Sequence, residues 1–241
     1  MKKIILSLLL VLFSLPCWAG VQDGLVGWWR LDEISGNAKD SIKGNTAIPT
    51  GTSILSACPR AGCRNFTGPT NYLVLTSSIS LTGPMSVFAW VKVPSTNTMQ
   101  PSYGGGVIFS YTASSCKAGD FFLSVNSGGR VLFTQCKTDG DTTAMHFSYS
   151  GGIGTFDQWN LIGATSDGTN TGIDFYLNGV RYNNDSNTNP SGWAVDKVIG
   201  RIYDSPGYYF QGSIDDVRVY NRKLTTQEVL DLYRFGAKFN Q

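Results

Sequence analysis

The feature that most constrains the fold is an alternation of apolar and polar residues that recurs along almost the whole chain. Short apolar runs are separated by segments rich in Gly, Asn, Ser, Thr and Asp. A period of two indicates β-strands, and many short strands divided by turn residues are typical of a sandwich or jelly roll. The runs that we expect to form strands are 25–31, 72–75, 86–93, 107–111, 121–125, 131–133, 159–164, 173–177, 180–182, 198–202 and 214–220.

Two short sequence motifs predict a particular turn and a particular helix. Asn178 and Gly179 lie between two such runs, and an Asn-Gly pair in that position predicts a hairpin with a type I′ turn. Thr225 and Glu228 form a capping box ahead of an apolar run, which predicts one short C-terminal helix. Gly236 is expected to lie just past the end of that helix.

The first residues read as a targeting segment. Lys2 and Lys3 precede an apolar run over 4–15, and the small residue Ala19 follows shortly after. The run is shorter than the roughly 20 apolar residues of a spanning helix. We therefore expect residues 1–19 to be a secretory signal peptide, without a transmembrane anchor, and residues 20–241 to form one domain. The protein is then secreted, periplasmic or at the cell surface.

Charge excludes one class of partner. Removing Lys2 and Lys3 from the 19 basic residues leaves 17, which equals the 17 acidic residues. A chain with no net charge offers no bulk attraction to nucleic acid, so no nucleic-acid partner is expected. Single all-β domains commonly reach about 200–250 residues, so one large core is expected.

The cysteines fit an exported protein. Four remain after the signal segment, and an even number in an oxidising compartment predicts disulfides. A turn signal over 126–129 predicts a hairpin that brings Cys116 near Cys136. This pairs Cys116 with Cys136 and leaves Cys58 to pair with Cys63.

Two segments carry a family resemblance. The segment YFQGSIDDVRVYNRKLTTQEVLDLY over 209–233 closely resembles the closing strand and helix of bacterial laminin-G-like jelly-roll domains of the concanavalin A-like superfamily. The opening GLVGWWRLDEISGNAKDSIKGNTA over 24–47 resembles their first strand and loop, and PMSVFAWVKV, FDQWNLIGATSDG and GIDFYLNGVRY resemble their middle strands. The resemblance implies an all-β, two-sheet antiparallel jelly roll whose first and last strands are neighbours. Members include carbohydrate-binding, adhesion and accessory modules, and related folds include glucanases.

Catalysis is not expected, because the residues that it needs are missing. Glucanases of this superfamily usually carry the spacing Glu-x-Asp-x-x-Glu, whereas this chain has only Glu33 and Glu228, far apart. His146 is the single histidine and has no Gly-x-Ser-x-Gly elbow, which disfavours nucleophilic hydrolysis. A single histidine is also too few for the usual zinc sites made of paired cysteines and histidines, so the cysteines are not expected to bind zinc.

Calcium is the cofactor that we expect. If alternation holds over 214–220, Asp215 faces the core with Val217 and Val219, and Asp216 shares the opposite face with Arg218. A buried carboxylate costs several kcal/mol unless it is paired or binds a metal.

The loop over 37–45 offers the remaining oxygen donors, Asn37, Asp40 and Asn45. The family resemblance places this loop beside the closing strand. A structural calcium ion held by these residues and Asp215 is therefore the prediction, and the alternative is that backbone N–H groups satisfy Asp215 without an ion.

Aromatic residues in the loops suggest a sugar-binding surface. Four tryptophans lie within expected strands and are assigned to the core: Trp28, Trp29, Trp90 and Trp159. The expected ligand contacts come from Gly-, Pro- and Asn-rich loops instead: Trp193, Tyr203, Tyr208 and Tyr209. We therefore expect a lectin-like module that binds a glycan or glycoprotein. The alternatives are a structural or adhesive subunit that binds a cell-surface protein and, third, a glycoside hydrolase.

Overall fold

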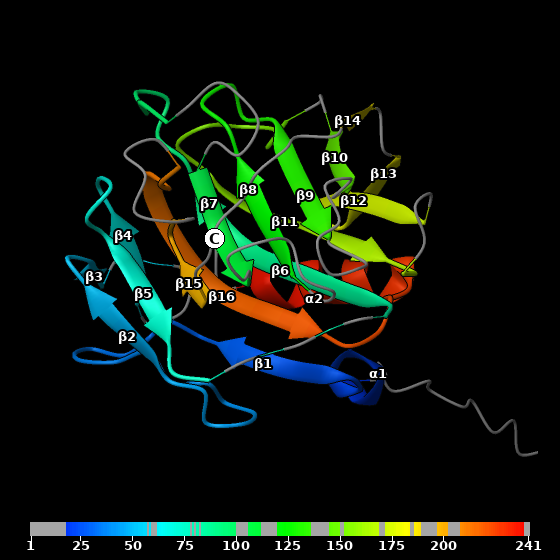
Figure 1. Ribbon diagram of the computed structural model, residues 1–241, viewed down its shortest axis with the longest axis horizontal. Helices are drawn as coiled ribbons and strands as arrows, with labels where there is room; N and C mark the ends of the chain where they lie inside the picture. The colour runs from blue at the N-terminus through cyan, green and yellow to red at the C-terminus, as the bar shows by residue number, and fades with distance from the viewer. Residues whose placement is uncertain are drawn as a thin grey trace, which may run out of the picture.

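Two antiparallel β-sheets lie face to face, which confirms the predicted jelly-roll sandwich (Figure 1). The computed structural model describes residues 18–238 apart from 57, 59–61, 78, 80, 82, 100–105, 112–119, 136–144, 150–151, 169–171, 184–185, 189–196 and 202–207. Helix α1 (Trp18–Gln22) and helix α2 (Thr226–Ala237) contact each other.

The first sheet has the strand order β13-β12-β11-β6-β16-β4-β3, and β1 also pairs with β16. We call it the helix-side sheet, because α2 packs on its outer face. Its strands are β1 (Leu25–Trp29), β3 (Ser53–Leu55), β4 (Cys63–Phe66), β6 (Met85–Lys92), β11 (Trp159–Ser166), β12 (Ile173–Leu177), β13 (Val180–Asn183) and β16 (Gly212–Tyr220).

The second sheet, called the open sheet below, has the order β14-β10-β9-β8-β7-β15-β5-β2. Its strands are β2 (Ala47–Thr50), β5 (Tyr72–Leu75), β7 (Gly106–Tyr111), β8 (Phe121–Val125), β9 (Val131–Gln135), β10 (Met145–Tyr149), β14 (Ser186–Thr188) and β15 (Lys197–Ile199). The β8–β9 hairpin lies where the turn signal over 126–129 predicts it.

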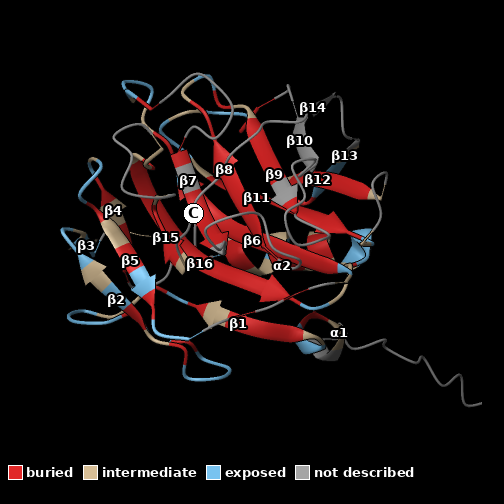
Figure 2. Cartoon of the chain, in the orientation of Figure 1, coloured by how far each residue is buried: buried red, intermediate tan, exposed pale blue. Residues whose placement is uncertain are grey.

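Apolar side chains form two clusters, one on each side of the helix-side sheet. The larger cluster fills the space between the sheets, and most strand residues are buried in Figure 2. The smaller cluster lies beneath α2 and includes Trp90, Val229 and Leu232. The tryptophan assignment is confirmed: Trp29 and Trp90 are buried, and the half-buried Trp28 and Trp159 pack against the smaller cluster.

The predicted hairpin and helix start are both confirmed. Asn178 and Gly179 have φ of 52° and 81° between β12 and β13, as a type I′ turn needs. Thr225 and Glu228 complete the capping box of α2. The predicted helix end at Gly236 is wrong, because α2 continues through it. This glycine packs on Trp90 instead, and a Cβ there would lie 2.4 Å from the indole Nε1.

The first and last strands are neighbours, as the family resemblance implies. Trp28 pairs with Arg218, and Leu25 pairs with Tyr220. Further toward its start, the same edge of β16 pairs with β4, through Ile214 and Arg64. β16 therefore changes partner partway along one edge, and a bulge occurs at that point, between Asp215 and Arg218.

Candidate functional site

The bulge breaks the alternation on which the metal prediction rested. Ile214 and Val217 both belong to the core between the sheets, so two residues, Asp215 and Asp216, occupy the interval where regular alternation allows one. Asp216 has φ of 51°, a left-handed conformation that Asp tolerates better than most residues. Asp215 is buried, as expected, but it does not share a face with Val217.

Asp216 and Arg218 form a buried ion pair. Arg218 Nε and Nη2 each lie 3.1 Å from one carboxylate oxygen of Asp216, and the two side chains are only 2% and 5% exposed. Burial is the largest single influence on the pKa of Arg218 and lowers it, but Asp216 and Tyr220 together outweigh burial and hold the pKa above its ordinary value. The sharing of one face by these two residues is therefore confirmed.

Trp28 covers this ion pair. Its indole N–H donates to Asp216, and the guanidinium of Arg218 lies 4.4 Å from the indole ring centroid. Arg30 approaches the same ring at 5.6 Å. The cluster joins β1 to the bulge of β16 through charge-assisted and cation–π contacts, so it fastens the two chain ends together.

Asp40 is already engaged by the backbone. Its two carboxylate oxygens accept N–H bonds from Trp28, Ile42, Lys43 and Asn45, at 2.9 to 3.3 Å. These bonds satisfy a buried carboxylate in the way that a metal otherwise would. Asp40 therefore organises the loop over 37–45 and fixes it to β1.

The predicted calcium ligands are not brought together. Trp29 bridges Asp40 on one edge of β1 and pairs with Val217 on the other edge, so β1 separates the loop from the bulge that holds Asp215. Asn45 uses its side-chain amide to bond Ser77.

Asn37 is exposed, and the part of the chain that the structure describes has no group of three or more His, Cys, Asp or Glu placed to hold a metal. The arrangement does not fit one ion shared by Asp215, Asp40, Asn37 and Asn45. Calcium stays a prediction, and comparing thermal unfolding in calcium with unfolding in chelator tests it.

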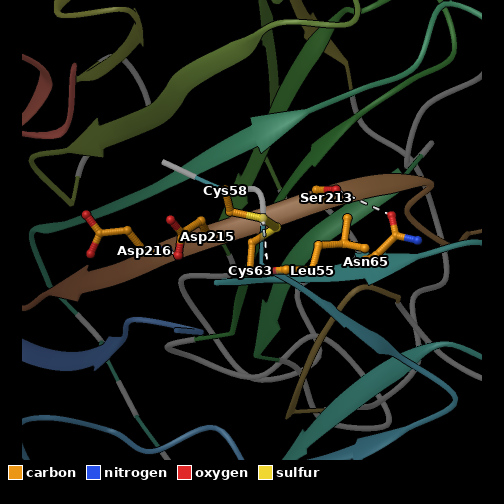
Figure 3. The surroundings of a disulfide bond; sticks show 7 residues. All are labelled: Leu55, Cys58, Cys63, Asn65, Ser213, Asp215 and Asp216. Atoms are coloured by element: carbon orange, nitrogen blue, oxygen red, sulfur yellow. Dashed lines mark hydrogen bonds between the residues drawn. A yellow bond between two sulfur atoms is a disulfide. The ribbon is translucent and has the colours of Figure 1, made fainter. Parts of the chain in front are cut away.

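One of the two predicted disulfides is confirmed. Cys58 and Cys63 are bonded, with Cα atoms 5.8 Å apart, and Figure 3 shows Asp215 beside them. Cys63 begins β4, so the bond fastens the β3–β4 connection next to the bulge. Cys116 and Cys136 lie outside the described residues, and their pairing stays a prediction.

Replacing both Cys58 and Cys63 by Ser should lower the free energy of unfolding by about 2 kcal/mol, because the bond closes a short loop in the unfolded chain. Urea unfolding of the double variant, compared with wild type under non-reducing conditions, measures this. The free energy of unfolding of wild type treated with a reductant should fall toward that of the double variant. Equal stabilities would show that the bond contributes nothing.

An aromatic and cationic cluster lies at the open sheet. Tyr208 and Tyr209 are half-buried, and the backbone of Tyr209 bridges that of Arg201. The Arg201 guanidinium lies 3.4 Å from the ring centroid of Tyr72. We call Tyr72, Arg201, Tyr208 and Tyr209 the tyrosine cluster. The other two predicted ligand contacts, Trp193 and Tyr203, lie outside the described residues.

Sequence reasoning missed two members of this cluster. Leu73 and Leu75 point into the core, so alternation in β5 turns Tyr72 and Val74 to the outer face of the open sheet. A tyrosine at the start of an amphipathic strand was therefore a usable signal for Tyr72. Arg201 had no such signal, because its position depends on the pairing of β15 with β5.

The three residues considered for catalysis, Glu33, Glu228 and His146, all have roles in the fold. Glu33 accepts a 2.6 Å bond from the backbone N–H of Lys39 and lies 3.9 Å from the buried Arg64. Glu228 belongs to the helix cap. His146 is a strand residue of β10 and pairs with Thr134 and Thr188.

Solved structures share the fold at low sequence identity. The botulinum neurotoxin type G receptor binding domain is 17% identical with a TM-score of 0.62, covering 88% of this chain and 51% of its own. The binding domain of botulinum neurotoxin DC in complex with rat synaptotagmin II is 14% identical, with a TM-score of 0.61 and coverages of 90% and 52%. This chain thus spans about half the length of those domains.

Another similar structure is matched over nearly its full length. Domain 4 of AbnA, a GH43 extracellular arabinanase from Geobacillus stearothermophilus, in complex with arabinotriose, is 16% identical with a TM-score of 0.60, covering 87% of this chain and 98% of its own. The chain matches no curated protein sequence. No helix in the described parts is long and apolar enough to cross a membrane.

The family model described as the concanavalin A-like lectin/glucanases superfamily (laminin G, type 3) matches residues 66–230, which include most strands of both sheets and the start of α2. The match covers more than half of the chain and agrees with the observed sandwich. The chain therefore belongs to this laminin-G-like family of the concanavalin A-like superfamily.

Proposed function

We propose that this chain is an exported, non-catalytic module that binds a glycan or glycoprotein at the cell surface or outside the cell. The observation that carries the proposal is Tyr72 on the outer face of the open sheet, with Arg201 over its ring and the backbone of Tyr209 paired with that of Arg201. The Arg201 guanidinium lies over one face of the Tyr72 ring, so a sugar would pack on the other face of this ring or on a neighbouring tyrosine, and the guanidinium would donate to its hydroxyls.

The similar structures give further support. One is the binding domain of a toxin in complex with a protein receptor, and another is a domain of an arabinanase in complex with arabinotriose. Both are modules that bind a partner or a sugar. The structural surroundings of Glu33 and Glu228 support the absence of catalysis, because hydrolysis by a retaining mechanism needs two carboxyl groups about 5–5.5 Å apart across a substrate.

A glycan array tests the proposal. The exported protein should bind a restricted set of glycans, and Tyr72→Ala should weaken that binding about tenfold, since one stacked aromatic contributes roughly 1–1.5 kcal/mol. Tyr233→Ala is the matched control, because this half-buried tyrosine of α2 stacks on Trp90 of the helix-side sheet, away from the open sheet. Binding that survives Tyr72→Ala, or no binding to any glycan, would contradict the proposal.

A protein partner is the second candidate, favoured by an exposed apolar pair at the edge of the open sheet. Ile48 and Val74 are cross-strand partners and are 46% and 39% exposed. Val198 pairs with Val74 on the next strand but is fully buried, so the exposed surface consists of Ile48 and Val74. Ile48→Asp combined with Val74→Asp should abolish co-purification with a cell-surface partner and leave glycan binding intact, whereas Tyr72→Ala should weaken glycan binding and leave co-purification unchanged.

A further inference from the structure

Gly20, the residue that would follow the predicted signal peptide, is held against the C-terminal helix. Its carbonyl oxygen accepts a bond from Arg222 Nη2 and one from the backbone N–H of Asp23, the latter at 3.3 Å. Arg222 also donates to both carboxylate oxygens of Glu228, at 2.7 and 2.9 Å. The backbone of Gly20 is thereby fixed beside the capping-box carboxylate of α2.

At Gly20 the direction that a side chain would take points at that carboxylate. A Cβ built on Gly20 would lie 3.1 Å from Glu228 Oε1. That distance is tight for a carbon atom but is an ordinary hydrogen-bond distance for a nitrogen donor. A terminal residue can also turn about its Cα–C bond, and such a turn moves its amino nitrogen into the direction of the missing Cβ. The nitrogen would then lie about 3 Å from Glu228 Oε1, which is hydrogen-bonding distance.

The charges around Gly20 favour a cation. Asp23 and Glu228 supply two carboxylates, and Arg222 supplies one cation, 3.6 Å from Asp23. The next basic residue, Lys223, is engaged elsewhere, with its Nζ 2.9 Å from Asp174. An ammonium at Gly20 would balance two negative charges with two positive ones. The Asp23 side chain is mostly exposed to solvent, whereas the Glu228 side chain is only 18% exposed. Glu228 is therefore the stronger partner for an ammonium at Gly20.

We propose that cleavage between Ala19 and Gly20 creates an α-ammonium that pairs with Glu228 and so locks the new N-terminus onto the start of α2. The inference rests on the export proposed above. In the cleavage, water adds its hydroxyl to the Ala19 carbonyl carbon and a proton to the Gly20 nitrogen as the peptide bond breaks. The freed amine takes a second proton from solvent. Processing then installs a contact that the precursor lacks.

The first test is the intact mass and N-terminal sequence of the protein exported from its host. The proposal requires Gly20 as the first residue. A different first residue overturns it, and so does an uncleaved chain, without any bearing on the glycan-array result that tests the binding proposal.

The second test is the titration of the α-amino group, followed by NMR on the exported protein. Its pKa should lie about one pH unit above the ~7.7–8.0 of an ordinary α-amino group, because an opposite charge within about 4–6 Å favours the charged form. A group whose pKa is raised on folding contributes stability that is present below pH ~7.7 and is lost as pH rises through the folded value. The melting temperature should therefore fall between about pH 8 and 10, and α-acetylated protein should lack this fall.

Glu228→Gln separates the ion pair from the helix cap, because Gln serves as well as Glu in a capping box. This variant should return the α-amino pKa to its ordinary range and remove the pH dependence. The control is Asp231→Asn, on the same helix, where the carboxylate accepts from Gln227 and should leave the titration unchanged. An α-amino pKa that is the same in wild type and in Glu228→Gln overturns the proposal.

Discussion

Replacing Asp216 by Asn should lower the free energy of unfolding by about 3–5 kcal/mol, because it leaves the buried Arg218 guanidinium without its counter-charge. Asn keeps the size of the side chain and tolerates the positive φ of this position, so the loss reports the charge and not backbone strain. Urea unfolding at neutral pH, followed by tryptophan fluorescence, measures it.

A surface ion pair on the neighbouring strand end provides the control. Arg30 and Asp32 lie 3.0 Å apart with side chains 46% and 21% exposed, so Asp32→Asn should cost less than about 1 kcal/mol. Combining Asp216→Asn with Arg218→Met should restore part of the loss, because the uncompensated charge is then gone. A cost for Asp216→Asn no larger than that for Asp32→Asn would show that solvent reaches the pair.

Trp29→Ala should have an effect of similar size, about 3–5 kcal/mol, through the cavity that it opens between the sheets. The side chain is fully buried, its ring centroid lies 5.5 Å from that of Phe109, and its indole N–H donates to the Asn45 carbonyl at 2.7 Å. The substitution therefore removes core volume and leaves a buried carbonyl without its donor. Denaturant unfolding gives the loss directly.

The adjacent Trp28→Ala is the matched comparison. Trp28 is half-buried and lies on the opposite face of the same strand, so its removal should cost clearly less than that of Trp29. Equal costs for the two variants would mean that the cover over the Asp216–Arg218 pair contributes as much as the core does.

Much of the fold could be predicted, because local signals and tertiary structure agree over most of the chain. The type I′ turn at Asn178 and the capping box at Thr225 depend on a few neighbouring residues, and both are confirmed. Strands with a long alternation, such as β6 and β11, were also found. The short strands β3 and β14 carry Ser-Ile-Leu and Ser-Asn-Thr, which have too little pattern to separate them from loops.

The candidate sites were harder to predict, because they depend on pairings between distant segments. The bulge at Asp215 lies where the pairing partner of β16 changes from β4 to β1. No residue in the strand itself signals that change of partner. The simple alternation therefore failed at the position where the metal prediction needed it. Tyr72 and Arg201 meet for a similar reason, through strands far apart in the sequence.

The position of β16 has a consequence for how the chain folds. This strand pairs with β6 along one edge and with β1 and β4 along the other, yet it comes after all the other described strands in the chain. The helix-side sheet cannot close until the final segment is present, and the β1–β16 ladder spans almost the entire chain. Contacts of such high sequence separation slow folding, because the entropy of closing the long loop must be lost first. A chain that crossed a membrane unfolded could complete this sheet only after β16 had followed β1 across.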